Sequence, residues 1–187
     1  MTGTQPIPPV VAASVGEAGM VADVIAEAFW HLDAAVWLVA DPLARRRLLR
    51  AQFYLVVEHA VQCGSVDVLD DRSAAAVWLP NDPAAPLPPP RDYDRRLAAG
   101  CGGYTPRFQI LDALLADHHP ATRHHHLAFL AVLPTWQGTG RGSALLEHHH
   151  KILDAEGVDA YLEASSPRTR NLYARHGYQA GAPFRLP

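Results

Sequence analysis

Cysteine, basic charge and long apolar runs are all scarce in this 187-residue chain, and each shortage excludes a class of protein. The two cysteines, Cys63 and Cys101, are too few for a disulfide framework, and no CxxC pair indicates a zinc site. The formal net charge is −3, so we expect no basic surface for nucleic acid. No apolar run could span a bilayer, and the first basic residue is Arg45, unlike the start of a signal peptide. We therefore expect a cytoplasmic protein without nucleic-acid or membrane partners.

The composition suits one folded domain. Hydrophobic residues make up 49% of the chain, and the length fits a single domain with a sizeable core. Lysine occurs only at Lys151 while arginine, alanine and proline abound, which is typical of a bacterial genome rich in G and C. We expect a flexible N-terminal tail at 1–9 and one domain at 10–187. The proline-dense stretch 80–90 is interpreted as a loop within that domain, because what precedes it is too short to be a complete α/β domain.

Hydrophobic spacing predicts alternating strands and helices around one core, an α/β (α+β) order. Period-two or continuous apolar patterns predict strands, and apolar residues three and four apart predict helices. The expected strands are 10–13, 65–71, 73–80, 125–132, 158–164 and one after residue 178. The expected helices are 16–29, 43–62, 91–100, 107–118, 142–155 and 167–176.

A glycine-rich turn lies between the predicted strand 125–132 and the helix that follows it. Gly138, Gly140 and Gly142 alternate there, and Gln137 precedes them. Glycine lets the backbone approach an anion closely, and the free N–H groups of a helix's first turn point at it. The Rossmann spacing GxGxxG and the P-loop lysine are both absent. The pattern favours a pyrophosphate site, and a glycine turn without any ligand is the alternative.

These residues resemble a known family. Gln137-x-x-Gly140-x-Gly142 is similar to the Q/R-x-x-G-x-G/A acetyl-CoA signature of the GCN5-related N-acetyltransferases (GNAT). The stretches FLAVLPTWQGTGRGSALL and YLEASSPRTRNLYARHGY resemble the segments of that family around the signature and around its tyrosine. AFWHLDAAVWLVADPLARRRLL and AAAVWLP resemble a subgroup that includes puromycin N-acetyltransferase. The resemblance implies the GNAT fold, a central mixed, mostly antiparallel sheet splayed at the cofactor cleft with helices on both faces.

The resemblance also implies an activity. Such an enzyme moves the acetyl group of acetyl-CoA to the amine of a small molecule by direct attack in a ternary complex, as a monomer or homodimer. The chain shows no Cys–His or Ser–His constellation for a covalent intermediate, which agrees with direct attack. A non-catalytic acyl-CoA-binding regulatory or scaffold module, and a protein or peptide N-acetyltransferase, are the alternatives.

The resemblance assigns the cofactor contacts. The pyrophosphate would be held by backbone amides, with added charge from the Arg141 side chain, and the pantetheine arm would pair with a strand edge. Thr169 stands where members of the subgroup often have an asparagine, and its hydroxyl could replace that contact. The implied cofactor-binding residues are Leu130, Ala131, Val132, Gln137, Gly138, Thr139, Gly140, Arg141, Gly142, Ser143 and Thr169.

Tyr173 matches the family tyrosine that protonates the departing thiolate, with a core tyrosine as the alternative. The general base stays open between Glu163, His126 and a chain of waters. Glu163 lies inside a predicted strand, where a carboxylate is costly unless it is paired or functional, so it could also brace the cleft. His126 begins the strand that lines the cleft, and histidine titrates near neutral pH.

Phe29, His31 and Trp37 lie near the end of the first predicted helix, a region that forms part of the acceptor wall in the subgroup that the chain resembles. Trp78 is a further candidate for the acceptor side, and core packing is the alternative for each of the aromatic residues. The eleven histidines do not predict a metal site, so we expect no metal. Three consecutive histidines on a helix point in different directions. His124 and His126 share a strand face and could form half a site, but no carboxylate or cysteine stands beside them at a suggestive spacing.

Overall fold

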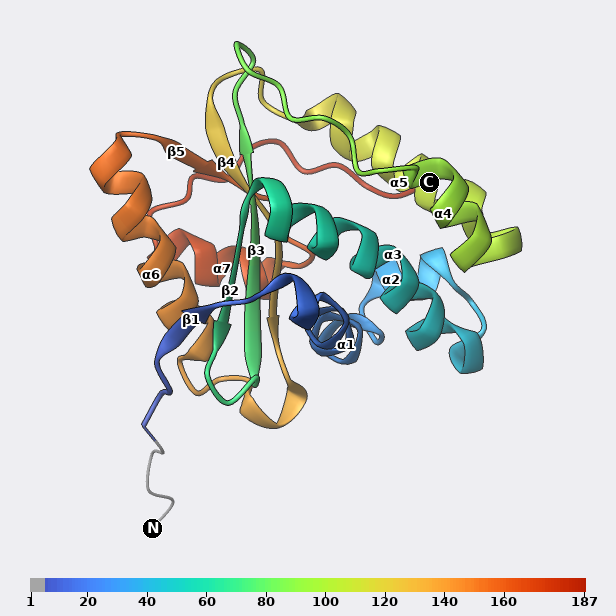
Figure 1. Cartoon of the computed structure of the whole chain (residues 1–187), viewed down its shortest axis with the longest axis horizontal. Helices are drawn as coiled ribbons and strands as arrows, with labels where there is room; N and C mark the ends of the chain where they lie inside the picture. The colour runs from blue at the N-terminus through green and yellow to red at the C-terminus, as the bar shows by residue number, and fades with distance from the viewer. Residues whose placement is uncertain (1–5) are drawn as a thin grey trace.

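A five-stranded sheet lies between two helical layers in the computed structural model, which describes residues 6–187 (Figure 1). Each strand lies beside the next in chain order; all neighbours are antiparallel except the last two, which are parallel. The mixed, mostly antiparallel sheet and the α/β class expected from the sequence are confirmed. The strands are β1 (Val10–Ala12), β2 (Ser65–Leu69), β3 (Ala74–Asn81), β4 (His124–Val132) and β5 (Asp159–Tyr161).

The predicted helices all form, and one short helix is added. Among residues 6–187, no helix is both long and apolar enough to cross a membrane. The predicted tail 1–9 lies outside the described residues at 1–5, and 6–9 have no regular structure. The helices are α1 (Ala18–Phe29), α2 (Asp33–Leu38), α3 (Pro42–Cys63), α4 (Tyr93–Cys101), α5 (Thr105–His118), α6 (Arg141–Glu156) and α7 (Pro167–Arg175), with single 3-10 turns at Val15–Glu17, Gly102–Tyr104 and Pro134–Trp136.

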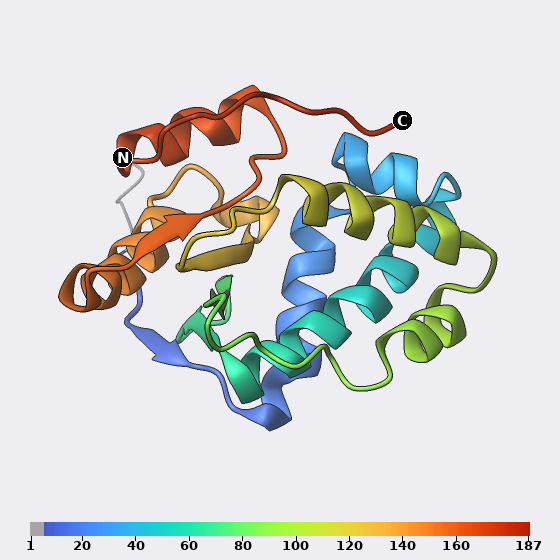
Figure 2. The same cartoon turned by 90° about the horizontal axis from the view of Figure 1, so that it is seen from above.

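The sheet is buried on both faces, and β3 shows why its sequence is almost continuously apolar. Ala75 and Val77 pack into the core under α1 and α3, whereas Ala76 and Trp78 pack under α6. Figure 2 shows the layer containing α6 on one side of the sheet and the layer containing α1 and α3 on the other. Because both faces of the strand are covered, the polar residues of a half-exposed strand would be costly here.

The prediction of a final strand is wrong. Residues 176–187, all of them described, contain no strand, and the chain instead runs as a coil towards α5 and α2 (Figure 1). The ring of Phe184 stacks on that of His118 with centroids 4.1 Å apart, and Trp37 Nε1 donates to the carbonyl oxygen of Pro187 at 3.0 Å. Pro183 and Pro187 lack the N–H groups that a sheet ladder requires, which is consistent with this coil.

Strands β4 and β5 diverge soon after they pair. Their register joins His124 to Asp159 and His126 to Tyr161, where β5 ends. Strand β5 is thus shorter than the predicted 158–164. Strand β4 continues through residues 127–132 without β5 beside it, so within residues 6–187 this edge of β4 has no neighbouring strand. The sheet therefore opens between β4 and β5, as the resemblance implied.

Candidate active site

The glycine turn of residues 137–143, named the phosphate turn here, connects β4 to α6. Gly138 and Gly140 have φ values of +79° and +87°, the left-handed region that favours glycine. The first bond of α6 runs from Ala144 N–H to the carbonyl of Gly140 at 3.0 Å, so the N–H groups of residues 141–143 precede the helical ladder. Residues 137–140 are exposed. The turn therefore offers backbone donors at a helix N-terminus to an anion from solvent.

The Arg141 side chain is buried and has several partners, one of which is the Thr139 hydroxyl of the phosphate turn, 3.4 Å from Nη1. Its side chain is only 2% exposed, and it donates from Nε to Ser73 Oγ at 2.8 Å and from Nη2 to Asp71 Oδ2 at 3.0 Å. Its guanidinium also lies 3.8 Å from the centroid of the Trp136 ring. The side chain thus joins the start of α6 to the β2–β3 turn, and its contribution of charge to phosphate binding stays a prediction.

The hydroxyls and amide of the predicted cofactor residues already have partners. Gln137 Nε2 donates to the carbonyl of Val132 at 3.2 Å, which holds the turn against the end of β4. Ser143 Oγ lies 3.0 Å from Nε2 of His176, a residue that the sequence did not single out. The Thr169 hydroxyl donates to the carbonyl of Ser166 at 2.9 Å and caps α7, so a contact with cofactor would compete with this bond.

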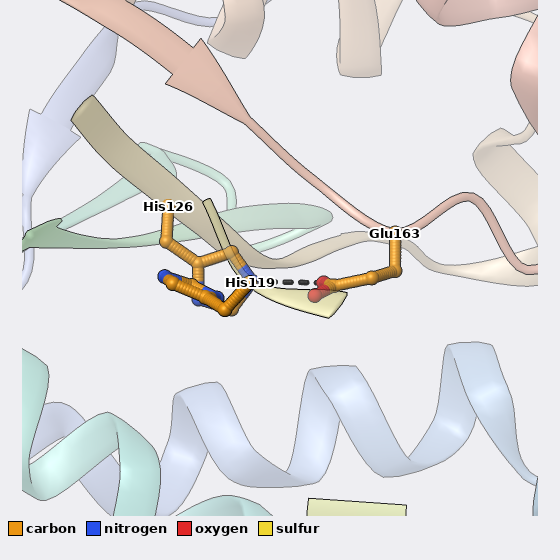
Figure 3. Close-up of side chains that lie close together, drawn as sticks. All are labelled: His119, His126 and Glu163. Carbon is orange, nitrogen blue, oxygen red and sulfur yellow. Dashed lines mark hydrogen bonds and ion pairs between the residues drawn. The ribbon is translucent and has the colours of Figure 1, made fainter. Parts of the chain in front are cut away.

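His126 and Glu163 meet where β4 and β5 part. His126 Nε2 lies 2.9 Å from Glu163 Oε2, and the two side chains are 17% and 16% exposed (Figure 3). Burial would raise the pKa of Glu163, but the hydrogen bond and charge of His126 outweigh it and hold that pKa below its usual range. Among residues 6–187, the buried Glu163 Oε1 has no hydrogen-bond partner. The pair thus combines an ionised carboxylate with an imidazole, two groups that can accept a proton.

His119 is a neighbour of this pair that the sequence did not assign to catalysis. It immediately follows α5, and its ring centroid lies 4.9 Å from that of His126, edge to face. Burial lowers the pKa of His119 to about 4, and repulsion from the nearby His126 and His124 adds to this effect. The Tyr161 hydroxyl stays protonated because burial and then Glu163 raise its pKa to about 12. A neutral imidazole and a neutral phenol therefore border the pair.

Tyr173 lies on α7 and packs against the core under α6. Leu130 and Val132, from the free end of β4, pack against this same core. Burial raises the pKa of Tyr173 to about 12, so its phenol carries a proton at neutral pH. The ring centroid lies 5.7 Å from that of Tyr178, and that contact is part of the packing alternative. The residue combines partial burial with a proton available for donation.

The predicted acceptor residues are not gathered at one place. Phe29 packs edge-on against Phe53 and Phe129 with centroid distances of 5.9 and 6.2 Å. His31 is exposed, and Trp37 is bonded to the C-terminal residue as described above. Trp78 is fully buried on the α6 side and stacks on His149 at 4.1 Å. We therefore leave Trp78 out of the acceptor site proposed below.

Comparison with known proteins agrees with this arrangement. Residues 97–180 match the family described as the acetyltransferase (GNAT) domain. A Corynebacterium glutamicum structure described as "histone acetyltransferase HPA2 and related acetyltransferase" is 29% identical, with a TM-score of 0.64, 92% of this chain and 84% of that chain being covered. Two further structures share the fold at lower identity.

The first is a GCN5-related N-acetyltransferase from Ralstonia eutropha, 15% identical, with a TM-score of 0.60 and coverage of 96% and 97%. The second is a polyamine N-acetyltransferase from Drosophila melanogaster, 19% identical, with a TM-score of 0.59 and coverage of 91% and 83%. The chain is therefore an acetyl-transfer enzyme in which residues 97–180 match the GNAT acetyltransferase domain, and the splayed sheet and the phosphate turn agree with that match.

Proposed function

We propose that this enzyme transfers the acetyl group of acetyl-CoA directly to the amine of a small molecule within a ternary complex, like the puromycin N-acetyltransferase subgroup that its sequence resembles. The observation that carries the proposal is the His126–Glu163 pair at the point where β4 and β5 part. Acetyl-CoA is an intracellular metabolite, so we place the enzyme in the cytoplasm. Its composition leads us to infer a bacterial source.

The cofactor would run along the free edge of β4. GNAT acetyltransferases use acetyl-CoA as acyl donor, and the exposed donors of the phosphate turn suit its pyrophosphate. Residues 127–132 span about 20 Å at about 3.3 Å per residue, and they lead from the turn back to His126. Backbone groups of Leu130, Ala131 and Val132 would pair with the pantetheine arm, as an added strand pairs with a sheet edge. The thioester would then arrive beside the His126–Glu163 pair.

The acceptor amine must lose a proton to become a nucleophile. The negative charge of Glu163 attracts the ammonium form, which first loses one proton to solvent and becomes the free amine. As the nitrogen attacks the thioester carbonyl, the His126–Glu163 pair accepts a second proton from it and later releases that proton to solvent. The carbon–sulfur bond then breaks, and the hydroxyl of Tyr173 gives its proton to the departing thiolate. Solvent returns that proton to Tyr173. No covalent acyl-enzyme forms in this sequence.

The amine class is inferred from the resemblance. Phe29 ends α1, Trp37 lies on α2 and His31 lies between these helices, in the region that the resemblance assigns to the acceptor, although the structure does not gather the three side chains at one place. The fold is shared with enzymes described as acting on polyamine and agmatine, which is consistent with an amine acceptor. A lysine side chain in a protein is the alternative acceptor.

Cofactor placement is tested by titrating acetyl-CoA calorimetrically into the wild type, Gly142→Glu and Gly142→Gln. A Cβ at residue 142 would meet Val132 and Leu130 side-chain atoms at 3.6 and 3.7 Å, which is ordinary contact, so the backbone should tolerate both variants. The glutamate should weaken binding by about tenfold or more relative to glutamine, because its carboxylate repels phosphate by at least about 1.4 kcal/mol. Equal binding by the two variants would contradict the phosphate turn.

Catalysis is tested by following thiol release with puromycin, agmatine, spermidine, phenethylamine and a lysine peptide. Tyr173→Phe should lower kcat by about 10²-fold or more with little change in acetyl-CoA affinity, since an acid acts in the transition state. Tyr178→Phe is the matched control, because its hydroxyl instead meets His150 Nε2 at 3.0 Å. Turnover of the peptide alone would replace the small-molecule proposal with protein acetylation. An unchanged kcat in Tyr173→Phe would remove Tyr173 as the acid.

A further inference from the structure

The His126–Glu163 pair is part of a larger cluster, formed by residues that lie far apart in the sequence. His124 and His126 share one face of β4, while His125 faces α6, where its Nδ1 lies 3.1 Å from Nε2 of His149. The fold then brings His119, from the end of α5, and Glu163, just beyond β5, to His126 (Figure 3). A ring nitrogen of each of these two histidines and a carboxylate oxygen of Glu163 lie within 4.8 Å of one another.

The donor set matches a transition-metal site. Two imidazoles and one carboxylate are the protein ligands of several Zn²⁺ enzymes, in which a fourth position stays open for water or substrate. The three side chains are half-buried, so a bound ion would keep access to solvent.

Outer contacts hold His119 in place. His124 Nδ1 lies 2.7 Å from the carbonyl oxygen of Thr122, and His124 Nε2 lies 3.0 Å from His119 Nε2. With both rings neutral, His124 donates to the carbonyl and accepts from His119, so His119 keeps a lone pair on Nδ1. Such chains from a ligating imidazole to a backbone carbonyl orient metal ligands. Glu163 adds a buried oxygen, Oε1, that has no partner among residues 6–187.

We propose that His119, His126 and Glu163 bind one Zn²⁺ ion, and that this ion inhibits acetyl transfer. The ion occupies the lone pairs of His126 and Glu163 that accept the proton of the amine. A bound dication at this place also repels an incoming ammonium. The inhibitory half of this inference rests on the proposed function, whereas the binding half rests on the three side chains alone.

Metal binding is measured without activity. Co²⁺ is added to the wild-type protein, and the visible absorption of the bound Co²⁺ is recorded. Zn²⁺ is then titrated into the Co²⁺-loaded protein to measure competition. In a separate experiment, Zn²⁺ is titrated calorimetrically into the metal-free protein. We expect one strong site, with the absorption of a four- or five-coordinate Co²⁺ ion that Zn²⁺ removes. His119→Gln and Glu163→Gln should each weaken that site at least about tenfold, since loss of even an outer partner of a ligand costs about 10–100-fold.

His118→Gln is the matched control on the neighbouring position. Its Nδ1 lies 2.9 Å from the carbonyl of Leu114, and its ring stacks on Phe184, so it is outside the cluster. This variant should bind metal as the wild type does. Absence of a one-to-one site in the wild type, or equal weakening by His118→Gln and His119→Gln, would overturn the proposal.

Inhibition is then measured with whichever amine the screen identifies. Zn²⁺ should suppress wild-type turnover, EDTA should restore it, and His119→Gln should require at least about tenfold more Zn²⁺ relative to its own metal-free rate. Binding without inhibition would overturn the inhibitory half and would count against His126 and Glu163 as the base. If no amine is acetylated, the proposed function fails while the cobalt spectrum still decides whether the metal site exists.

Discussion

A buried pair beneath α6 gives the sharpest test of how this fold is stabilised. Asp67 on β2 and His149 on α6 have side-chain exposures of 5% and 2%, and Asp67 Oδ2 lies 3.2 Å from His149 Nδ1. The Ser65 hydroxyl donates to the other carboxylate oxygen at 3.2 Å. Trp78 stacks flat on His149, with an interplanar angle of 6°. The pair therefore joins the sheet to its covering helix inside an apolar core.

His149→Leu removes the main donor to Asp67 and leaves its carboxylate buried with one hydroxyl. Breaking a buried pair from one side costs about 3–5 kcal/mol, and the lost ring stacking adds about 0.5–1.5 kcal/mol. The leucine recovers part of this through apolar burial, so we expect a net loss of about 3–4 kcal/mol in the free energy of unfolding. For a chain of this size that lowers Tm by roughly 6–16 °C.

The double variant Asp67→Val with His149→Leu should be more stable than His149→Leu alone. Replacing both polar partners leaves no buried charge, and such replacements are often neutral or stabilising. The free energies are measured by urea unfolding followed by circular dichroism, with half-buried His148→Leu as the control on the same helix. The single variant Asp67→Val is measured as well. If the double variant loses as much free energy of unfolding as Asp67→Val and His149→Leu lose together, the two side chains are not coupled and the reasoning is refuted.

Three further predictions concern the phosphate turn, acid stability and thiol reactivity. Gly140→Ala should cost about 1–2 kcal/mol of stability, because φ is +87° and a Cβ would lie 3.3 Å from Ile7 Cδ1; Gly142→Ala should cost less, and equal losses in urea unfolding would contradict this. Burial opposes ionisation of Asp71, but hydrogen bonds from Ser73 and Arg141 outweigh burial and lower the pKa of Asp71 in the folded protein. The ionised carboxylate therefore stabilises the fold above the pKa of about 3.9 that an aspartate has in the unfolded chain, and this stabilisation is lost as the pH falls from there through the lower pKa of the folded protein. Asp71→Asn should therefore lose less stability on acidification than the wild type, and parallel acid curves would sink this account. Burial raises the pKa of Cys101 to about 11, so iodoacetamide at pH 8 should modify the less buried Cys63 first, as mass spectrometry would show; faster modification of Cys101 in the native protein would contradict it.

The local pattern of apolar residues was sufficient to predict most of the elements. The continuous apolar run of β3 reports burial on both faces of the strand, and the spacing in α1 and α3 reports burial on one side of each helix, because side-chain direction repeats every two residues in a strand and every 3.6 in a helix. The turn at Gly138 and Gly140 was also predictable, since only glycine adopts its φ values without strain. The coil after residue 178 could not be predicted from the sequence, because an extended coil and an edge strand can have similar sequences. Contacts with distant helices decide between the two.

The partners of the charged and polar groups were decided by the tertiary structure. Arg141 stands in the signature turn, yet its guanidinium binds a carboxylate 70 residues earlier in the chain, and no local period encodes that contact. The sequence named His126 and Glu163 separately as possible bases, and only the pairing of β4 with β5 placed them 2.9 Å apart. His119 joined them because the loop between α5 and β4 places its ring against those of His124 and His126. Periodicity determines which face a residue occupies, whereas strand register and helix packing determine what it meets there.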